Sequence, residues 1–250
     1  MEIHNIIIAA IIYYFAGMIS VSVGGTSLVT IPLLIFLGMD TKTAIATNMF
    51  TLVFMSMSGV IGFRKKIEWS HSNFIFIAVL LTILGSWLGA KLLLNFNEEI
   101  LERFLAVIIC LFLPVFLLKK DIGIEERREE STLPRLIISS FAIFVLGIYG
   151  GFFSGGYMML LSYVLILGLG LNFLQTAGMT KILNLFSSLV ACLVFFANDL
   201  IDFRIAVPLG TAIFLGGLSG SKLAIRKGNV WVRKVFIIVA GILVVKLLFF

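Results

Sequence analysis

Apolar runs recur along nearly the whole chain, and only short polar or glycine-containing clusters interrupt them. Of the 250 residues, 60% are hydrophobic and 13% are charged, and the mean hydropathy is +1.15. A soluble domain has roughly 45–50% apolar and about 25% charged residues. Because no water-soluble fold can bury so much apolar surface, many segments must face lipid. The sequence therefore predicts an all-α polytopic protein of the cell (inner) membrane, with the lipid bilayer as its surroundings.

Several other classes of protein are not expected from this composition. The first apolar run follows Glu2 and His4 instead of a basic segment, which predicts that it is retained and not cleaved. The net charge of +6 comes from basic residues clustered in short loops at helix ends, a topological pattern that does not indicate a nucleic-acid partner. Cys110 and Cys192 lie inside apolar runs and indicate neither a disulfide framework nor a metal site. The sequence contains no G-x-S-x-G or H-E-x-x-H motif, so we expect neither an enzyme nor a bound cofactor.

A polar loop divides the apolar stretches into two sets of four. The loop contains the mixed-charge run from Glu125 to Glu130, which cannot enter lipid. We therefore predict a first transmembrane repeat at 1–118, a polar cytoplasmic linker at 119–134 and a second transmembrane repeat at 135–250. The apolar stretches lie at approximately 5–38, 43–63, 73–94, 100–118, 135–170, 173–196, 203–224 and 230–250.

The first stretch of each half is too long for one simple crossing. Stretches 5–38 and 135–170 would each form a helix on the order of 50 Å long, against a hydrocarbon core of about 30 Å. A glycine pair interrupts each of them, Gly24-Gly25 in the first and Gly155-Gly156 in the second. We predict two helical segments joined by a break at each place, so that the first helix of each half is broken and hairpin-like.

The basic clusters favour an inverted relation between the halves. Arg64, Lys65 and Lys66 should face the cytoplasm together with the central loop. The basic cluster of the second half, from Lys222 to Lys234, lies one loop later than its counterpart in the first half. It returns to the cytoplasm only if each long stretch turns back on itself. Eight crossings with parallel halves remain the alternative topology.

Short segments match between the halves in the same order, which predicts an internal repeat. Inverted repeats with helices broken at corresponding places are the architecture of many secondary transporters, whose substrate lies near the midplane between the breaks. Freed backbone N–H groups and helix N-termini there suit an anion. Alternatively, the glycines serve close helix packing, the interpretation that we favour for the third pair. The matched pairs are Ser22-Val23-Gly24-Gly25 with Phe153-Ser154-Gly155-Gly156, Ala46-Thr47-Asn48 with Met179-Thr180-Lys181, and Gly85-Ser86-Trp87-Leu88-Gly89-Ala90-Lys91 with Gly216-Gly217-Leu218-Ser219-Gly220-Ser221-Lys222.

Lys181 is the most informative charge of the chain. It lies inside an apolar stretch about two turns from its start, where a cation costs several kcal/mol unless it faces a cavity or a partner. We predict that it binds substrate, although a lysine that reaches to the membrane interface is the alternative. Neutral hydrogen-bond donors near it and near the breaks suit oxyanion oxygens. The predicted substrate-binding residues are Ser22, Gly24, Gly25, Thr26, Thr47, Asn48, Ser154, Gly155, Gly156, Thr180, Lys181 and Asn184.

These residues and their neighbours resemble the TauE/SafE sulfite exporter family, also called the toluene sulfonate uptake permease family. The resemblance covers nearly the whole chain and implies a transporter for sulfite, sulfonates or related sulfur or carboxylate anions, without selecting the anion. The chain departs from the usual pattern after the second glycine pair, where the segment Tyr157 to Ser162 replaces small residues and proline. The segments that carry the resemblance are Pro32-Leu33-Leu34, Ala46-Thr47-Asn48, Phe63-Arg64, Ile67-Glu68-Trp69, Gly155-Gly156, Thr180-Lys181, Asn184 and Asp202-Phe203.

The distribution of acids bears on the direction of transport. Every Asp and Glu lies at the end of an apolar stretch or in a loop, as do His4 and His71, so no buried acid is available as a proton relay. An inside-negative potential favours outward movement of an anion by about 2.3 kcal/mol per charge per 100 mV. We predict export of a small anionic substrate by a uniporter. Proton- or sodium-coupled uptake and a non-transporting membrane assembly partner remain alternatives, and the oligomeric state is left open.

Overall fold

The computed structural model describes residues 3–67, 72–97, 132–232 and 234–235. Regular structure in these ranges is helical, which confirms the predicted all-α class. The predicted stretch 100–118, most of the linker and most of the stretch 230–250 lie outside the described residues, as do Glu68, Trp69, His71 and Cys110. The helices are α1 (Ile3–Ser20), α2 (Ser27–Phe36), α3 (Thr41–Phe63), α4 (Ser72–Asn95), α6 (Leu133–Phe152), α7 (Tyr157–Leu169), α8 (Phe173–Phe196) and α9 (Phe203–Lys227).

Five of the described helices are long and apolar enough to cross a membrane. The remaining helices α1, α2 and α7 are shorter, and α2 with 10 residues and α7 with 13 residues are about 15 and 20 Å long at 1.5 Å per residue. The lengths and hydropathy of the long helices support a polytopic membrane protein. These long helices span Thr41–Phe63, Asn73–Asn95, Leu133–Phe152, Phe173–Phe196 and Phe203–Lys227.

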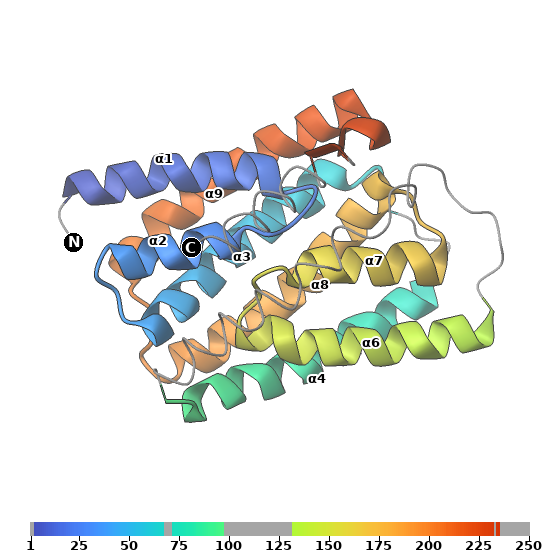
Figure 1. The fold of residues 1–250 in the computed structure, drawn as a ribbon, viewed down its shortest axis with the longest axis horizontal. Helices are drawn as coiled ribbons and strands as arrows, with labels where there is room; N and C mark the ends of the chain where they lie inside the picture. Colours follow the sequence, from blue (N-terminus) through green and yellow to red (C-terminus); the bar gives the residue numbers. More distant parts are fainter. Residues whose placement is uncertain (1–2, 68–71, 98–131, 233, 236–250) are drawn as a thin grey trace, which may run out of the picture.

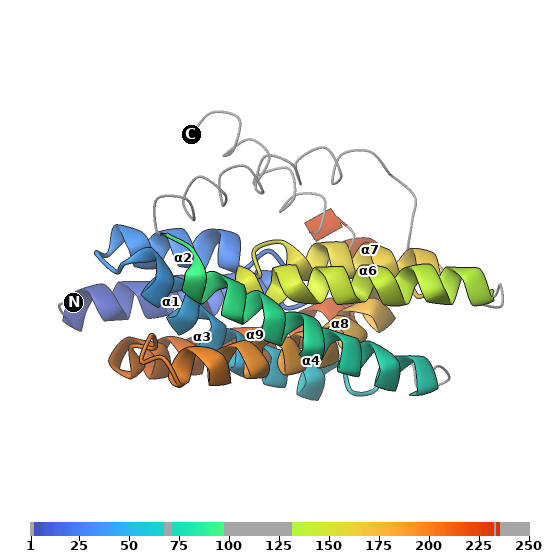
Figure 2. The same cartoon turned by 90° about the horizontal axis from the view of Figure 1, so that it is seen from below.

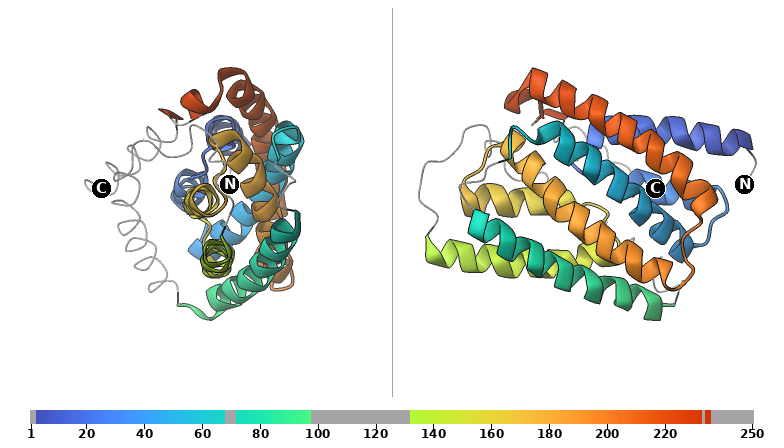
Figure 3. Two further views of the ribbon diagram at one scale, coloured as in Figure 1. Left: turned by 90° about the vertical axis from the view of Figure 1, so that its right-hand side faces the viewer. Right: turned by 180° about the vertical axis from the view of Figure 1, so that it is seen from behind.

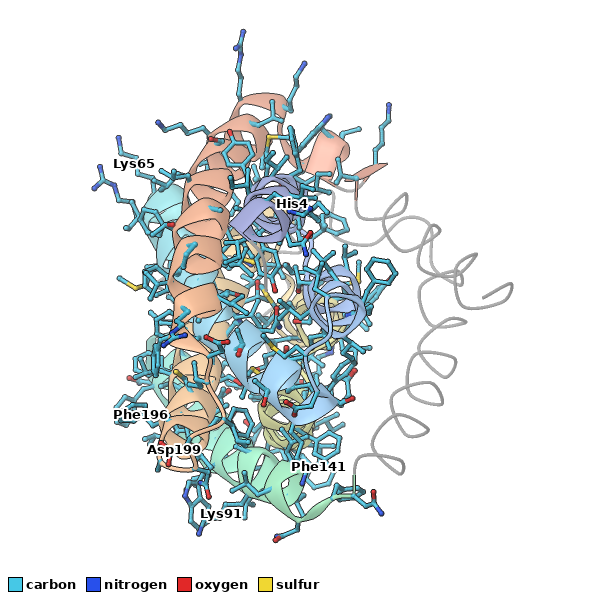
Figure 4. All side chains as sticks on the ribbon, turned by 90° about the vertical axis from the view of Figure 1, so that its left-hand side faces the viewer. His4, Lys65, Lys91, Phe141, Phe196 and Asp199 are labelled. Carbon is cyan, nitrogen blue, oxygen red and sulfur yellow. The ribbon has the colours of Figure 1, made fainter. Side chains whose placement is uncertain are left out.

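The described helices form two layers. Helices α1, α2, α6 and α7 make one layer, and α3, α4, α8 and α9 make the other (Figures 1 and 2). Within the second layer the order is α9, α3, α8, α4, and each neighbouring pair is in contact (Figure 3). Phe141 and Phe196, which are 70% and 57% exposed, lie at the periphery (Figure 4). Such exposed aromatic residues suit a surface that faces lipid.

Contacts between the helices are repeated when the two halves are exchanged. Helix α1 packs on α9, and α6 packs on α4, so the first described helix of each half contacts the last described helix of the other. Glycine makes both contacts close, since a Cβ added at Gly216 would meet the Tyr14 carbonyl oxygen, and one at Gly89 would meet the carbonyl oxygen of Ile148. The matched glycine motifs therefore lie at helix packing faces, where small residues let backbones approach.

Corresponding helices of the two halves run in opposite directions. In Figure 1, α1 runs from left to right and α6 from right to left, and the pairs α2 with α7, α3 with α8 and α4 with α9 are opposed in the same way.

Equivalent turns connect the short helix of each half to the long helix that follows. Gly38 and Gly170, with φ of +91° and +70°, lie just beyond the last helical turns of α2 and α7. The side chain of Asp40 then accepts a hydrogen bond from the Thr43 backbone at the start of α3, and Asn172 caps α8 in the same way. Helix α7 thus ends at Leu169, with Gly170 as its C-cap.

Candidate functional site

Two short non-helical segments interrupt the layer formed by α1, α2, α6 and α7. One lies between Ser20 and Ser27, and the other between Phe152 and Tyr157. Both lie near the middle of the molecule along its long axis (Figure 1). Their backbones turn through the left-handed region, where glycine is favoured because it has no Cβ. The residues with positive φ are Gly24 (+85°), Gly25 (+83°), Ser154 (+63°) and Gly156 (+77°).

The two interruptions, together with the helical turns that follow them, contact each other, although about half of the chain separates them. The hydroxyl oxygens of Ser27 and Ser154 are 2.8 Å apart and share a hydrogen bond. A Cβ added at Gly24 would lie 2.8 Å from the Met158 Cβ, and one added at Gly155 would lie 2.9 Å from Leu28 Cδ2. Because ordinary carbon contacts are about 3.5–4.0 Å, these positions leave no room for a side chain.

Asn48 is hydrogen-bonded to the first turn of α2. Its Nδ2 donates to Ser27 Oγ at 3.0 Å, and its Oδ1 accepts from Thr30 Oγ1 at 2.7 Å. The side chain is fully buried. Asn48 therefore joins α3 to the short helix that follows the first interruption, and through Ser27 it is linked to Ser154 of the second.

Lys181 of α8 is fully buried, and its Nζ donates to the sulfur of Met158 at 3.2 Å. A thioether is a weak acceptor and carries no charge, so this contact does not neutralise the ammonium group. The Nζ makes no ion pair within the described ranges. The aliphatic stem lies against α3 at Gly59, where an added Cβ would be 2.5 Å from Lys181 Cγ and 2.7 Å from Cδ.

Asn48 and Lys181 occupy corresponding places in the two halves. The match of the glycine pairs sets Ser27 opposite Met158, and the match of the following segments sets Asn48 opposite Lys181. The structure contains both contacts, Asn48 with Ser27 and Lys181 with Met158. The equivalent contact is therefore made by two neutral polar side chains in the first half and by a lysine and a thioether in the second.

Other predicted site residues lie around these contacts. Ser22 Oγ is buried and has no hydrogen-bond partner within the described ranges. Thr26 donates to the Met55 sulfur at 3.2 Å, while Asn184 Nδ2 donates to Ser56 Oγ at 2.6 Å. These polar side chains are buried, and the Asn184 contact joins α8 to α3 within one layer. The structure thus provides a buried polar region near the interruptions.

Thr47 and Thr180 are oriented differently from their neighbours. Thr47 Oγ1 accepts a hydrogen bond from the Asp202 backbone N at 3.1 Å, just before α9 begins. Thr180 Oγ1 donates to the Ala177 carbonyl of its own helix at 3.1 Å. The structure therefore joins Asn48 and Lys181 to the interrupted segments through side-chain contacts, but gives no such contact to Thr47 or Thr180.

The sequence prediction omitted several residues that the structure adds to this region. Met158 could have been found, because it follows the second glycine pair at the position that Ser27 occupies after the first. Thr30 lies one helical turn beyond Thr26, and its hydroxyl donates to Asn48 Oδ1. Gly59 carried no sequence signal, since its role depends on a contact between α3 and α8.

Acidic residues in the described ranges lie away from the buried polar region. They are Asp40, Asp199 and Asp202, and each lies in a loop or at the N-cap of a helix. In the same ranges, no group of three or more His, Cys, Asp or Glu side chains could hold a metal ion. Chemically, the region offers one cation, amide and hydroxyl groups and no carboxylate, which suits a small anion.

Comparison with known proteins gives a consistent result. A family model described as "Sulfite exporter TauE/SafE" matches residues 9–247. The "Probable membrane transporter protein YfcA" of Escherichia coli (strain K12) is 30% identical over 239 residues, which cover 94% of this chain and 86% of that protein. A "Probable membrane transporter protein" of Haemophilus influenzae is 27% identical over 238 residues, covering 94% of this chain and 91% of the relative. No solved structure matches the chain significantly.

Proposed function

Because the chain belongs to the TauE/SafE sulfite exporter family and is a membrane transporter, we propose that it carries a small sulfur-containing or organic anion of the sulfite and sulfonate class. The anion is exported down the membrane potential through a site near the midplane, between the two helix breaks. The first break joins α1 to α2 and the second joins α6 to α7.

The observation that carries this proposal is the buried, uncompensated cation at Lys181. Burying a charge without a partner costs several kcal/mol, and its present acceptor, the Met158 sulfur, recovers little of that cost. An anion oxygen in place of the sulfur would form a charge-assisted hydrogen bond, which is roughly twice as strong as a neutral one. The site is therefore more stable with an anion bound than without one.

Polar groups at the helix breaks complete the site. Ser22 Oγ is buried without a partner, so a bound oxyanion would satisfy it. Ser27 and Ser154 already bond to each other at 2.8 Å, and either hydroxyl can redirect its proton toward a ligand. The predicted residues Gly24, Gly25, Gly155 and Gly156 keep the two backbones close enough for groups from both halves to reach one anion.

We extend the proposal to the architecture, with repeats at 1–118 and 135–250 joined by a linker at 119–134. The opposite directions of α1 and α6 (Figure 1) support an inverted relation, in which the axis that exchanges the halves lies in the membrane plane. The basic clusters agree with it, because Arg64, Lys65, Lys66 and Lys222 line one cavity between α3 and α9. Both clusters thus lie at one face, the cytoplasmic one by the positive-inside rule.

The direction of transport follows from charge. In the described ranges the acidic residues are at helix ends, so they offer no carboxylate beside Lys181 to carry a proton through the core. An anion leaving a cell with an inside-negative potential gains about 2.3 kcal/mol per charge per 100 mV. That gain drives export by a uniporter without a coupling ion.

Anion flux in proteoliposomes tests the function. Vesicles loaded with sulfite are given a potential that drives anions out, and efflux is compared for wild type, Lys181→Gln and the exposed-residue control Lys91→Gln. We expect efflux in wild type and in the control, at least a tenfold loss in Lys181→Gln, and partial recovery in Lys181→Arg. No efflux of sulfite, sulfonates, thiosulfate or small carboxylates would refute the proposal, and uptake that requires a proton or sodium gradient would refute its export direction.

A further inference from the structure

A second polar site lies at the C-terminal end of α3, at its junction with α9. A cavity of about 560 Å³ is lined there by the cations Arg64, Lys65, Lys66 and Lys222. Among the described residues, no Asp or Glu lines this cavity, and the four basic side chains form no ion pair. Lys65 projects from the periphery of the helices (Figure 4). Four cations around one cavity produce a local field that attracts anions.

The cavity has an apolar side as well as a basic rim. Ile61, Leu218 and Ile225 line it together with the cations. Ile61 is 49% exposed, so a large apolar side chain is open beside the charges. At the inner end of the cavity α3 and α9 are tightly packed, because a Cβ at Gly62 would overlap the Ser221 side chain. The cavity therefore opens outward beside the charges and is closed between the helices.

From this combination we infer that the cavity binds the phosphate-bearing headgroup of an anionic membrane lipid. The basic rim suits the phosphate, and the exposed isoleucine suits the beginning of an acyl chain. A free inorganic anion would make no favourable contact with the apolar side. Under the proposed topology the cavity faces the cytoplasmic leaflet, where anionic lipids are concentrated and basic pockets between helices bind their headgroups. The site is separate from the transport site, since its residues make none of the contacts of Lys181 or Asn48.

Lipid binding to the purified full-length chain tests the inference. Phosphatidylglycerol and phosphatidylcholine are titrated into the detergent-solubilised protein, and bound lipid is counted by native mass spectrometry. The variant Lys65→Gln with Lys222→Gln is compared with Lys91→Gln with Arg204→Gln, which removes the same charge from exposed residues elsewhere. We expect wild type and the control to prefer phosphatidylglycerol. The first variant should bind it about 30-fold more weakly, because each surface cation contributes about 1 kcal/mol.

Competition separates the lipid from other anions. Inorganic phosphate and glycerol 3-phosphate should fail to displace phosphatidylglycerol at concentrations far above that of the lipid. Equal binding of the two lipids by wild type, or equal loss in both double variants, would overturn the inference. Efficient displacement by inorganic phosphate would show a site for a free anion and overturn the lipid assignment. None of these outcomes depends on whether sulfite is transported, so this test and the flux test fail independently.

Discussion

At the scale of single residues, the proposed transport depends on a lysine whose burial opposes stability. Lys181 is fully buried beside a neutral sulfur. We expect Lys181→Met to keep the volume, remove the unpaired charge and raise the free energy of unfolding by about 1–3 kcal/mol, while anion flux is lost. Thermal unfolding in detergent and proteoliposome flux measure the two effects. A lysine with a purely structural role would make stability fall together with flux.

Gly59 controls the position of that lysine. An added Cβ would lie 2.5 Å from Lys181 Cγ, so Gly59→Ala should displace the side chain, lower flux at least tenfold and cost about 1–3 kcal/mol by overpacking. In a Lys181→Ala background the Cγ is absent, and the same glycine substitution should cost little. A double-mutant cycle on unfolding measures this coupling, and equal costs in both backgrounds would contradict the contact.

At the scale of elements, the two helix breaks should stabilise each other. Gly24 and Gly38 have similar φ, +85° and +91°, but a Cβ at Gly24 would meet Met158, whereas one at Gly38 would meet nothing within 4 Å. Both alanine variants carry the left-handed penalty of about 1–2 kcal/mol. We expect Gly24→Ala to cost about 1–3 kcal/mol more than Gly38→Ala, as measured by thermal unfolding. Equal costs would show that the packing between the breaks contributes nothing.

Sequence reasoning predicted the helical, polytopic character because hydropathy reports burial in lipid directly. It could not distinguish Thr47 from Asn48, because neighbouring residues on a helix point about 100° apart and the phase of α3 is set by tertiary packing. Asn48 contacts Ser27, and Thr47 contacts the backbone of Asp202. The role of Gly59 could not be predicted for a related reason, since it depends on a side chain of another helix filling the space beside the glycine.

At the scale of the whole molecule, the proposed inverted arrangement makes a prediction about sidedness. In a background with Cys110 and Cys192 replaced, single cysteines at Lys65 and Lys227 should react with a membrane-impermeant thiol reagent only from the cytoplasmic side. A cysteine at Asn198 should react only from the outside. All three positions are exposed. Parallel halves would instead place positions 65 and 227 on opposite sides, and labelling of intact and permeabilised cells distinguishes the arrangements.

The unequal contacts at Asn48 and Lys181 also bear on how such a chain can evolve. A dimer of two identical half-length polypeptides would carry the same residue at both places, and hence either two buried lysines or none. Two like charges in a low-dielectric interior repel strongly, and none would leave an anion without a counter-charge. Joining both halves in a single gene removes that restriction, because each copy can then mutate alone. A single chain can therefore hold one positive charge at the proposed site, which a symmetric dimer cannot.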